Sequence, residues 1–197
     1  MRLKRYFRGL GALLLVSWMA PRDAGATVVA PLDLRGMVSQ ADEIALGRVE
    51  AQRSRWTADH SAILTEVTLR VERGVKGVRD GERITLLREG GEVDGLGMLV
   101  RGAARFEPGE EVLVFLERRD GLPRQAQKAT APSAGPRWTV GMAQGKMRIA
   151  SVAGRRMAVR NMEGLAFLGR PPEEPAVRPL DELLAEIAAL VQAEGGR

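Results

Sequence analysis

The sequence predicts a mainly β protein, built as a small antiparallel β-barrel with a short N-terminal helix and a C-terminal amphipathic helix. The first observation is the stretch from Thr65 to Gly77, where apolar and polar residues alternate over a run rich in β-branched side chains. A strand with one buried and one solvated face favours an antiparallel sheet. The second observation is a series of about five to seven short strands separated by glycine-marked turns, which fits a five-stranded OB-like barrel.

The N-terminus has the three parts of a secretory signal peptide. Met1 to Arg8 is basic, Gly9 to Ala20 is apolar, and Ala24-Gly25-Ala26 is a small-x-small cleavage signal. We therefore predict a signal peptide over residues 1–26, cleaved before Thr27. A single membrane anchor is the alternative, but the apolar run is shorter than the roughly 20 residues that a spanning helix needs. The mature protein is expected in the periplasm or outside the cell, without stable membrane insertion.

The charge of the mature chain argues against nucleic acid as a partner. The whole chain has 30 Lys+Arg and 25 Asp+Glu, and the predicted leader holds five of the bases and one of the acids, so the mature net charge is +1. Proteins that bind nucleic acid usually present a clustered basic face. The chain has no cysteine, so the barrel of an exported protein must hold together without disulfides.

The barrel domain is predicted over residues 27–170. A short helix is expected at Leu32–Ala41, with Asp33 as its cap. The strands expected after it are 44–51, 62–75, 82–88, 98–100, 111–117, 138–141 and 146–149, with 157–159 as a further candidate. Residues 53–61 are expected to be a polar loop, and the segments 138–141 and 146–149 to pair with each other. The strand 111–117 is apolar on both faces, so it is expected to be central.

A Pro-rich linker is predicted at 171–179, followed by an amphipathic helix at 180–194. Its apolar stripe consists of Leu180, Leu183, Leu184, Ile187, Leu190 and Val191. This stripe either docks on the barrel or meets a partner.

Two short motifs resemble catalytic signatures, but neither meets the requirements of the site that it resembles. Gly141 to Lys146 has the wrong glycine spacing for a phosphate loop, and Met147 stands where Ser or Thr is needed. Asp59-His60-Ser61 contains the residue types of a hydrolase triad, but adjacent residues in a loop rarely reach triad geometry.

The glycine-dense loop from Gly90 to Gly97 carries Glu92 and Asp94, which could bind Ca²⁺ only with several further oxygens. The chain has one histidine and no cysteine, which leaves only carboxylates as further zinc ligands and argues against a zinc site. The sequence therefore predicts no catalytic, cofactor-binding or metal-binding set.

Several blocks, in this order, resemble a group of uncharacterised exported bacterial proteins. They are Pro31–Leu34 with Ala41–Val49, Thr65–Glu72 with Val75–Gly77, Gly90–Val93, Phe106–Leu116 and Val140–Lys146. More distantly, the pattern is similar to OB-fold domains of the netrin and metalloproteinase-inhibitor (TIMP) type. That resemblance implies a barrel and, for inhibition, a cysteine at the N-terminus, whereas the mature chain here is expected to begin at Thr27.

The leading hypothesis is an exported, non-catalytic binding protein that acts through protein contacts, for example as a protease inhibitor or an envelope-complex component. The candidate interaction residues are Thr27, Val28, Trp56, Glu92, Asp94, Trp138, Leu184 and Ile187. Packing inside the protein is the alternative for the two tryptophans. The alternative functions are a carrier of a small apolar ligand inside the barrel, and a hydrolase using Glu92 and Asp94.

Overall fold

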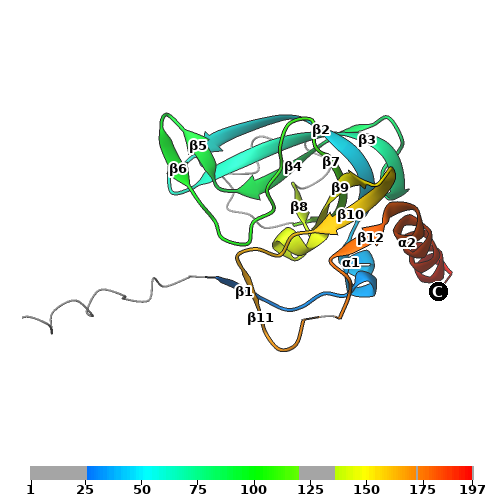
Figure 1. Ribbon diagram of the computed structural model, residues 1–197. Helices are drawn as coiled ribbons and strands as arrows, with labels where there is room; N and C mark the ends of the chain where they lie inside the picture. The colour runs from blue at the N-terminus through cyan, green and yellow to red at the C-terminus, as the bar shows by residue number, and fades with distance from the viewer. Residues whose placement is uncertain (1–25, 120–135, 172, 197) are drawn as a thin grey trace, which may run out of the picture.

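A closed five-stranded barrel forms the centre of the computed structural model, which describes residues 26–119, 136–171 and 173–196 (Figure 1). The barrel strands are β2 (Glu43–Trp56), β3 (Ile63–Lys76), β4 (Arg83–Glu89), β7 (Glu111–Arg118) and β8 (Arg137–Thr139). Their order around the barrel is β7-β2-β3-β4-β8, and β8 pairs back onto β7. Only the β4–β8 pair is parallel among these neighbours. The predicted mainly β, OB-like barrel is confirmed.

The sheet continues beyond the barrel from β7. Its extension consists of β9 (Lys146–Val152), β10 (Arg155–Arg160) and β12 (Val177–Pro179). Two small sheets lie apart from it: the parallel pair β1 (Thr27–Val29) and β11 (Leu165–Phe167), and the hairpin β5 (Gly91–Val93) and β6 (Leu96–Met98). A 3₁₀ turn, η2 (Met142–Gly145), precedes β9.

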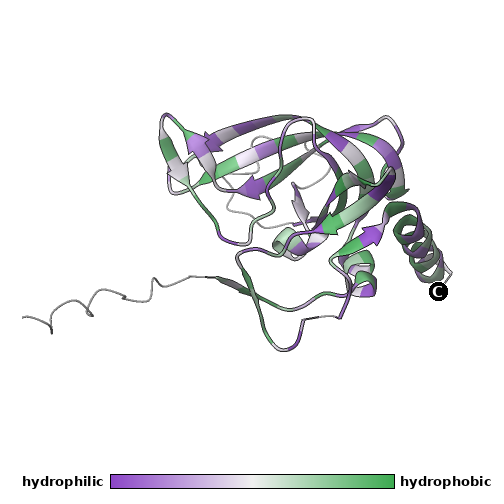
Figure 2. Cartoon of the chain, in the orientation of Figure 1, coloured by the Kyte–Doolittle hydropathy of each residue, from purple (hydrophilic) through white to green (hydrophobic). Residues whose placement is uncertain are grey.

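The strand β7 belongs to two hydrophobic cores at once. Val112, Val114 and Leu116 point into the barrel, while Leu113 and Phe115 point to its outside, where the helices pack. This division follows from the alternation of side chains along a strand. It confirms the prediction that this apolar strand is central, and Figure 2 shows similar alternation between hydrophilic and hydrophobic residues along β2 and β3.

The barrel interior is filled by apolar side chains of modest size. They are Ala45, Val49, Val67, Leu69, Val71, Ile84, Leu86, Ala104, Phe106, Val112, Val114 and Leu116. Val, Leu and Ile carry most of this packing, as expected for a chain with few aromatic residues.

Both predicted helices form, and both pack on the barrel. Helix α1 (Leu34–Gln40) begins at the predicted cap, where the Asp33 carboxylate accepts a hydrogen bond from the backbone N–H of Gly36 at 2.7 Å. Helix α2 (Leu180–Gly195) buries Leu180, Leu183, Leu184 and Ile187 in the core outside the barrel. Of the two expectations for the apolar stripe, docking is therefore the one observed. Among the residues described here, no helix combines the length and apolar character needed to cross a membrane.

Three local predictions were wrong. The strand β2 continues to Trp56, so the expected loop 53–61 shrinks to a turn after it, which is closed by a hydrogen bond from Thr57 N–H to the Ala62 carbonyl at 2.8 Å. The strand expected at 98–100 lies at Leu96–Met98 instead. The segments expected to pair with each other, β8 and β9, pair with opposite ends of β7.

The predicted linker is attached to the fold at two points. Its last three residues form β12 on β10. The Glu174 carboxylate accepts a hydrogen bond from the Leu34 N–H at 2.8 Å and pairs with Arg160 at 3.0 Å.

Candidate functional site

Three of the predicted interaction residues lie in the core, so the interpretation of them as surface residues is corrected. Leu184 and Ile187 are 3% and 0% exposed, because helix α2 turns its stripe toward the barrel. Trp138 is 4% exposed and packs with Leu64 and Leu87. For this tryptophan the packing alternative holds.

Trp56 is half-buried at the end of β2, and its ring stacks on His60 with 5.8 Å between centroids. The Asp59 carboxylate accepts hydrogen bonds from the hydroxyls of Thr57 (2.6 Å) and Ser61 (2.8 Å). These bonds hold the pKa of Asp59 below its ordinary value. His60 therefore faces an indole ring, and Ser61 donates to the aspartate directly, which is not the order of a catalytic triad.

Glu92 and Asp94 are both exposed on the β5–β6 hairpin. Asp94 occupies its turn with a positive φ of 52°, while Glu92 lies in the strand opposite Gly97. Within the ranges that the structure covers, no three side chains of His, Asp or Glu converge in a way that would hold a metal ion.

Thr27 and Val28 lie in β1, beside a loop that leads from β6 to β7. The backbone N–H of Thr27 donates to the Gly164 carbonyl at 3.0 Å, and its hydroxyl donates to the Arg101 carbonyl at 2.5 Å. Val28 is 59% exposed. The predicted mature N-terminus is thus anchored to the fold, with its second side chain in solvent.

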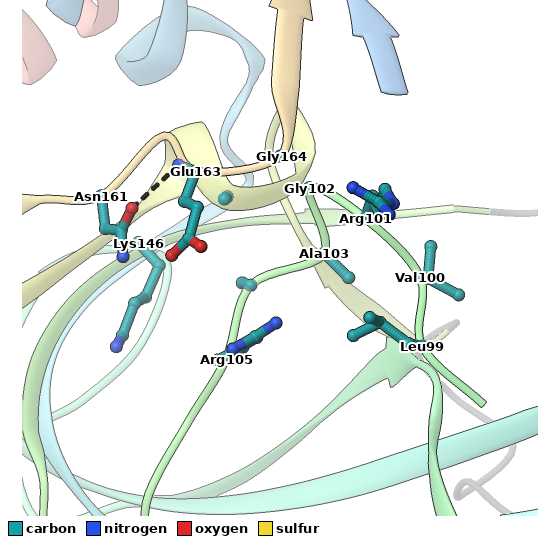
Figure 3. Close-up of a pocket in the computed structure, with 12 residues that line it drawn as sticks. Leu99, Val100, Arg101, Gly102, Ala103, Arg105, Lys146, Asn161, Glu163 and Gly164 are labelled. Atoms are coloured by element: carbon teal, nitrogen blue, oxygen red, sulfur yellow. Dashed lines mark hydrogen bonds between the residues drawn. The ribbon is translucent and has the colours of Figure 1, made fainter. Parts of the chain in front are cut away.

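Sequence reasoning missed one surface feature, a chain of three neighbouring hollows that share Arg105. Their volumes are about 280, 360 and 420 Å³. We call this feature the Arg105 groove. The charged residues along it are Arg88, Glu92, Arg101, Arg105, Glu107, Glu110, Lys146, Arg148, Arg160 and Glu163. In the view of Figure 3, Arg105 lies between Leu99 on one side and Lys146 on the other.

One wall of the groove is the loop 99–107, and contacts at several points hold it in place. Phe106 is 2% exposed inside the barrel, and its carbonyl accepts a hydrogen bond from the Gln52 side chain at 2.5 Å. The Gly102 carbonyl accepts from the Ala143 N–H at 3.0 Å. A Cβ on Gly164 would lie 2.8 Å from the Gly102 nitrogen, so the two walls meet in close backbone contact there.

Lys146 lies at the floor of the groove and is already neutralised by the protein. Its ammonium lies 2.5 Å from the Glu110 carboxylate and 5.4 Å from the centre of the Phe106 ring. Burial lowers the pKa of Lys146, and the Glu110 carboxylate opposes that shift. This pair fixes β9 to the turn before β7, and it leaves Lys146 with little charge to offer a ligand.

Arg88 and Arg105 differ from Lys146 because no carboxylate of the described residues pairs with either of them. Burial lowers the pKa of Arg88, the positive charge of Arg105 lowers it further, and only Glu107 acts in the opposite direction. The Arg88 Nε atom is buried and has no hydrogen-bond partner among the residues that the structure describes, while its Nη1 donates to the Glu89 carbonyl at 3.3 Å. The groove therefore holds two arginines that repel each other.

A sequence signal for the groove exists, although it is weak. Arg101 and Arg105 stand close together in an irregular stretch between two strands, a place where binding residues are common. Arg88 and Lys146 come from distant strands, and only the closed barrel brings them near. No family model, curated protein or solved structure matches this chain.

Proposed function

We propose that this is an exported, non-catalytic binding protein that acts through protein contacts, and that the Arg105 groove is its binding surface. The observation that carries the proposal is the sharing of Arg105 by three adjoining hollows, which gives the surface an elongated depression. The leader expected at residues 1–26 supports export.

The lining of the groove suits a polypeptide. Leu99 is 68% exposed on one wall, and Leu96 is 61% exposed on the hairpin beside it. Exposed apolar side chains next to arginines are typical of protein interfaces, where arginine is enriched and lysine is depleted. Binding in the barrel interior is less well supported, because twelve apolar side chains occupy it.

The protease-inhibitor version of this hypothesis also has a structural argument. Thr27 contacts Arg101 and Gly164, which line the groove, so the mature N-terminus and the groove would face a target together. If the N-terminus enters a protease, adding one residue before Thr27 should abolish inhibition. Inhibition that survives this extension would rule out entry by the N-terminus.

The test of the main proposal is comparative affinity capture. The protein is expressed in its source cells from the full-length gene with a C-terminal tag, so that export and processing take their natural course. Wild type is compared with Arg105→Glu and with Arg73→Glu, an exposed arginine on β3 outside the groove. We expect one protein partner to be recovered with wild type and Arg73→Glu and to be lost with Arg105→Glu.

Two results would contradict the proposal. One is the recovery of the same proteins with all three chains, since the groove would then play no part. The other is a wild-type sample that retains only a co-purified small molecule, which would favour the carrier alternative.

A further inference from the structure

The strongest unexplained feature of the groove is its pair of arginines. Arg88 projects from β4, and Arg105 projects from the loop 99–107. Both line the hollow of about 420 Å³, together with Leu99, Met98 and the glycines of the hairpin. Two arginines from separate elements thus line one cavity.

Other partly buried cations of the described chain have a carboxylate partner. Arg137 pairs with Glu43 at 2.5 Å, Lys146 with Glu110 at 2.5 Å, and Arg160 with Glu174 at 3.0 Å. Within the same residues, no carboxylate lies within 4.0 Å of Arg88 or Arg105. Arg88 is half-buried, and a partly desolvated cation without a partner is unfavourable, whereas Arg105 is exposed and adds a second positive charge beside it.

From this arrangement we propose that Arg88 and Arg105 form an anion subsite in the groove, which binds a carboxylate of an acidic side chain on the partner protein. The guanidinium fork matches the two oxygens of a carboxylate and is the common choice for planar, bidentate recognition. The buried Nε of Arg88 has no acceptor among the described residues, so the protein itself leaves this guanidinium incompletely satisfied. This inference deepens the proposed function and rests on it for the identity of the partner as a protein.

The surroundings favour a carboxylate over a phosphate group. Glu92 and Glu107 line the same hollow, each more than 4.0 Å from the two arginines. These two acids offset much of the positive charge of the two arginines, and the small net charge that remains suits a singly charged carboxylate better than a doubly charged phosphate. Arg101 and Arg148 lie farther along the groove, where they would extend the contact to other acidic residues of the same segment.

The subsite is tested with a defined probe rather than with the unknown partner. The probes are a short peptide of alternating Glu and Ala, the same peptide with Gln in place of Glu, and inorganic phosphate. Binding to the exported protein is measured by calorimetry and by NMR of the arginine Nε–H groups. We expect the Glu peptide to bind, the Gln peptide to bind at least about 10-fold more weakly, and phosphate to bind more weakly than the Glu peptide.

The variants decide whether the two arginines are responsible. Arg88→Met and Arg105→Met should each weaken the Glu peptide by about 10- to 100-fold, the effect of losing one charged hydrogen-bonding partner. Arg73→Met is the matched control and should bind like wild type. Arg105 is exposed, so its variant remains informative even if Arg88→Met does not fold.

Each result is decisive. Equal binding of the Glu and Gln peptides, phosphate binding stronger than peptide binding, or no binding at all would overturn the carboxylate subsite. If the peptide binds through Arg88 and Arg105 but Arg105→Glu still captures the protein partner, the subsite stands and the proposed function of the groove fails. If partner capture depends on Arg105 while the peptides do not bind, the function stands and the carboxylate inference fails.

Discussion

Two clusters of arginines in this protein differ in whether a carboxylate neutralises their positive charge. At the closure of the barrel, Glu43 on β2 is 2% exposed and accepts hydrogen bonds from Arg118 on β7 and Arg137 on β8. In the groove, Arg88 and Arg105 share a hollow without a carboxylate within 4.0 Å among the residues described. In the part of the chain that the structure describes, the first cluster has its carboxylate and the second has none.

The contrast separates a structural role from a binding role. The Glu43 cluster joins three strands where the barrel closes, so its charges serve the fold. Burial lowers the pKa of Arg88 and the positive charge of Arg105 lowers it further, so the arginine pair is locally unfavourable for the fold. Proteins commonly keep such locally unfavourable arrangements at functional sites, where a ligand relieves them.

The largest expected effect is at the barrel closure. Glu43→Ala should lower the free energy of unfolding by about 3–5 kcal/mol, because it leaves two arginines without their shared buried partner. Urea unfolding measures the change, with Glu163→Ala as a control for losing a carboxylate elsewhere. A loss below about 1 kcal/mol would mean that the cluster is not a structural closure.

The next effect concerns Lys146, a groove cation that has a carboxylate partner. Lys146→Met leaves the Glu110 carboxylate, whose side chain is 10% exposed, without its partner, and should cost about 1–3 kcal/mol. Urea unfolding at neutral pH measures this loss. An unchanged stability would show that solvent already screens the pair.

The same variant carries a pH prediction. Burial lowers the pKa of Lys146 in the folded state, so the folded protein binds fewer protons than the unfolded one between the lowered value and the ordinary value near 10.4. Wild-type stability should therefore rise relative to Lys146→Met as the pH increases from neutral toward the ordinary value near 10.4. A difference that stays constant over this range would contradict the assignment.

A smaller effect of opposite sign is expected in the groove. Arg88→Met removes a half-buried, unpartnered cation and keeps its apolar stem, so it should raise the free energy of unfolding by about 0.5–1 kcal/mol. Thermal unfolding at low salt measures the gain, which high salt should reduce. A clear loss of stability would place Arg88 in the same structural class as Arg137.

The smallest effect provides a baseline for both clusters. Arg170 and Glu173 form an ion pair with side chains 82% and 75% exposed. Glu173→Gln should change stability by less than about 0.5 kcal/mol, because water screens an exposed pair. A larger change would show that exposed charges matter here, and the contrast between the clusters would weaken.

The parts of the fold that could be predicted from the sequence are those with a strong local pattern. Alternation identified β3 almost to its ends, and the apolar stripe identified helix α2. The end of β2 was missed because its residues from Ala51 onward are partly or fully exposed, so no buried face marks them as a strand. The hydrophobic pattern of a sequence indicates which residues are buried. A strand that is exposed on both faces has a polar sequence, which cannot be told from that of a loop.

Pairing and the groove could not be predicted, because both depend on barrel closure. Nothing in the residues of β8 and β9 indicates that β7 lies between them. Arg88 and Arg105 are separated in sequence, and their conflict appears only when the loop 99–107 returns across the barrel. The sequence does not show whether the side chain of Trp138 faces the core or the solvent, which is why it was a candidate surface residue.

The strand β7 contributes side chains to both hydrophobic cores, and this has a consequence for how the protein folds. β7 pairs with β2, β8 and β9, and its two faces complete the barrel interior and the core beneath the helices. Neither core can form before this strand is in place, and its pairing with β2 joins residues far apart in the chain. Such non-local contacts make folding slow, and shared contacts make it cooperative. We therefore expect one unfolding transition for barrel and helices, with the tryptophan signal of the barrel and the helical circular dichroism of α2 lost together.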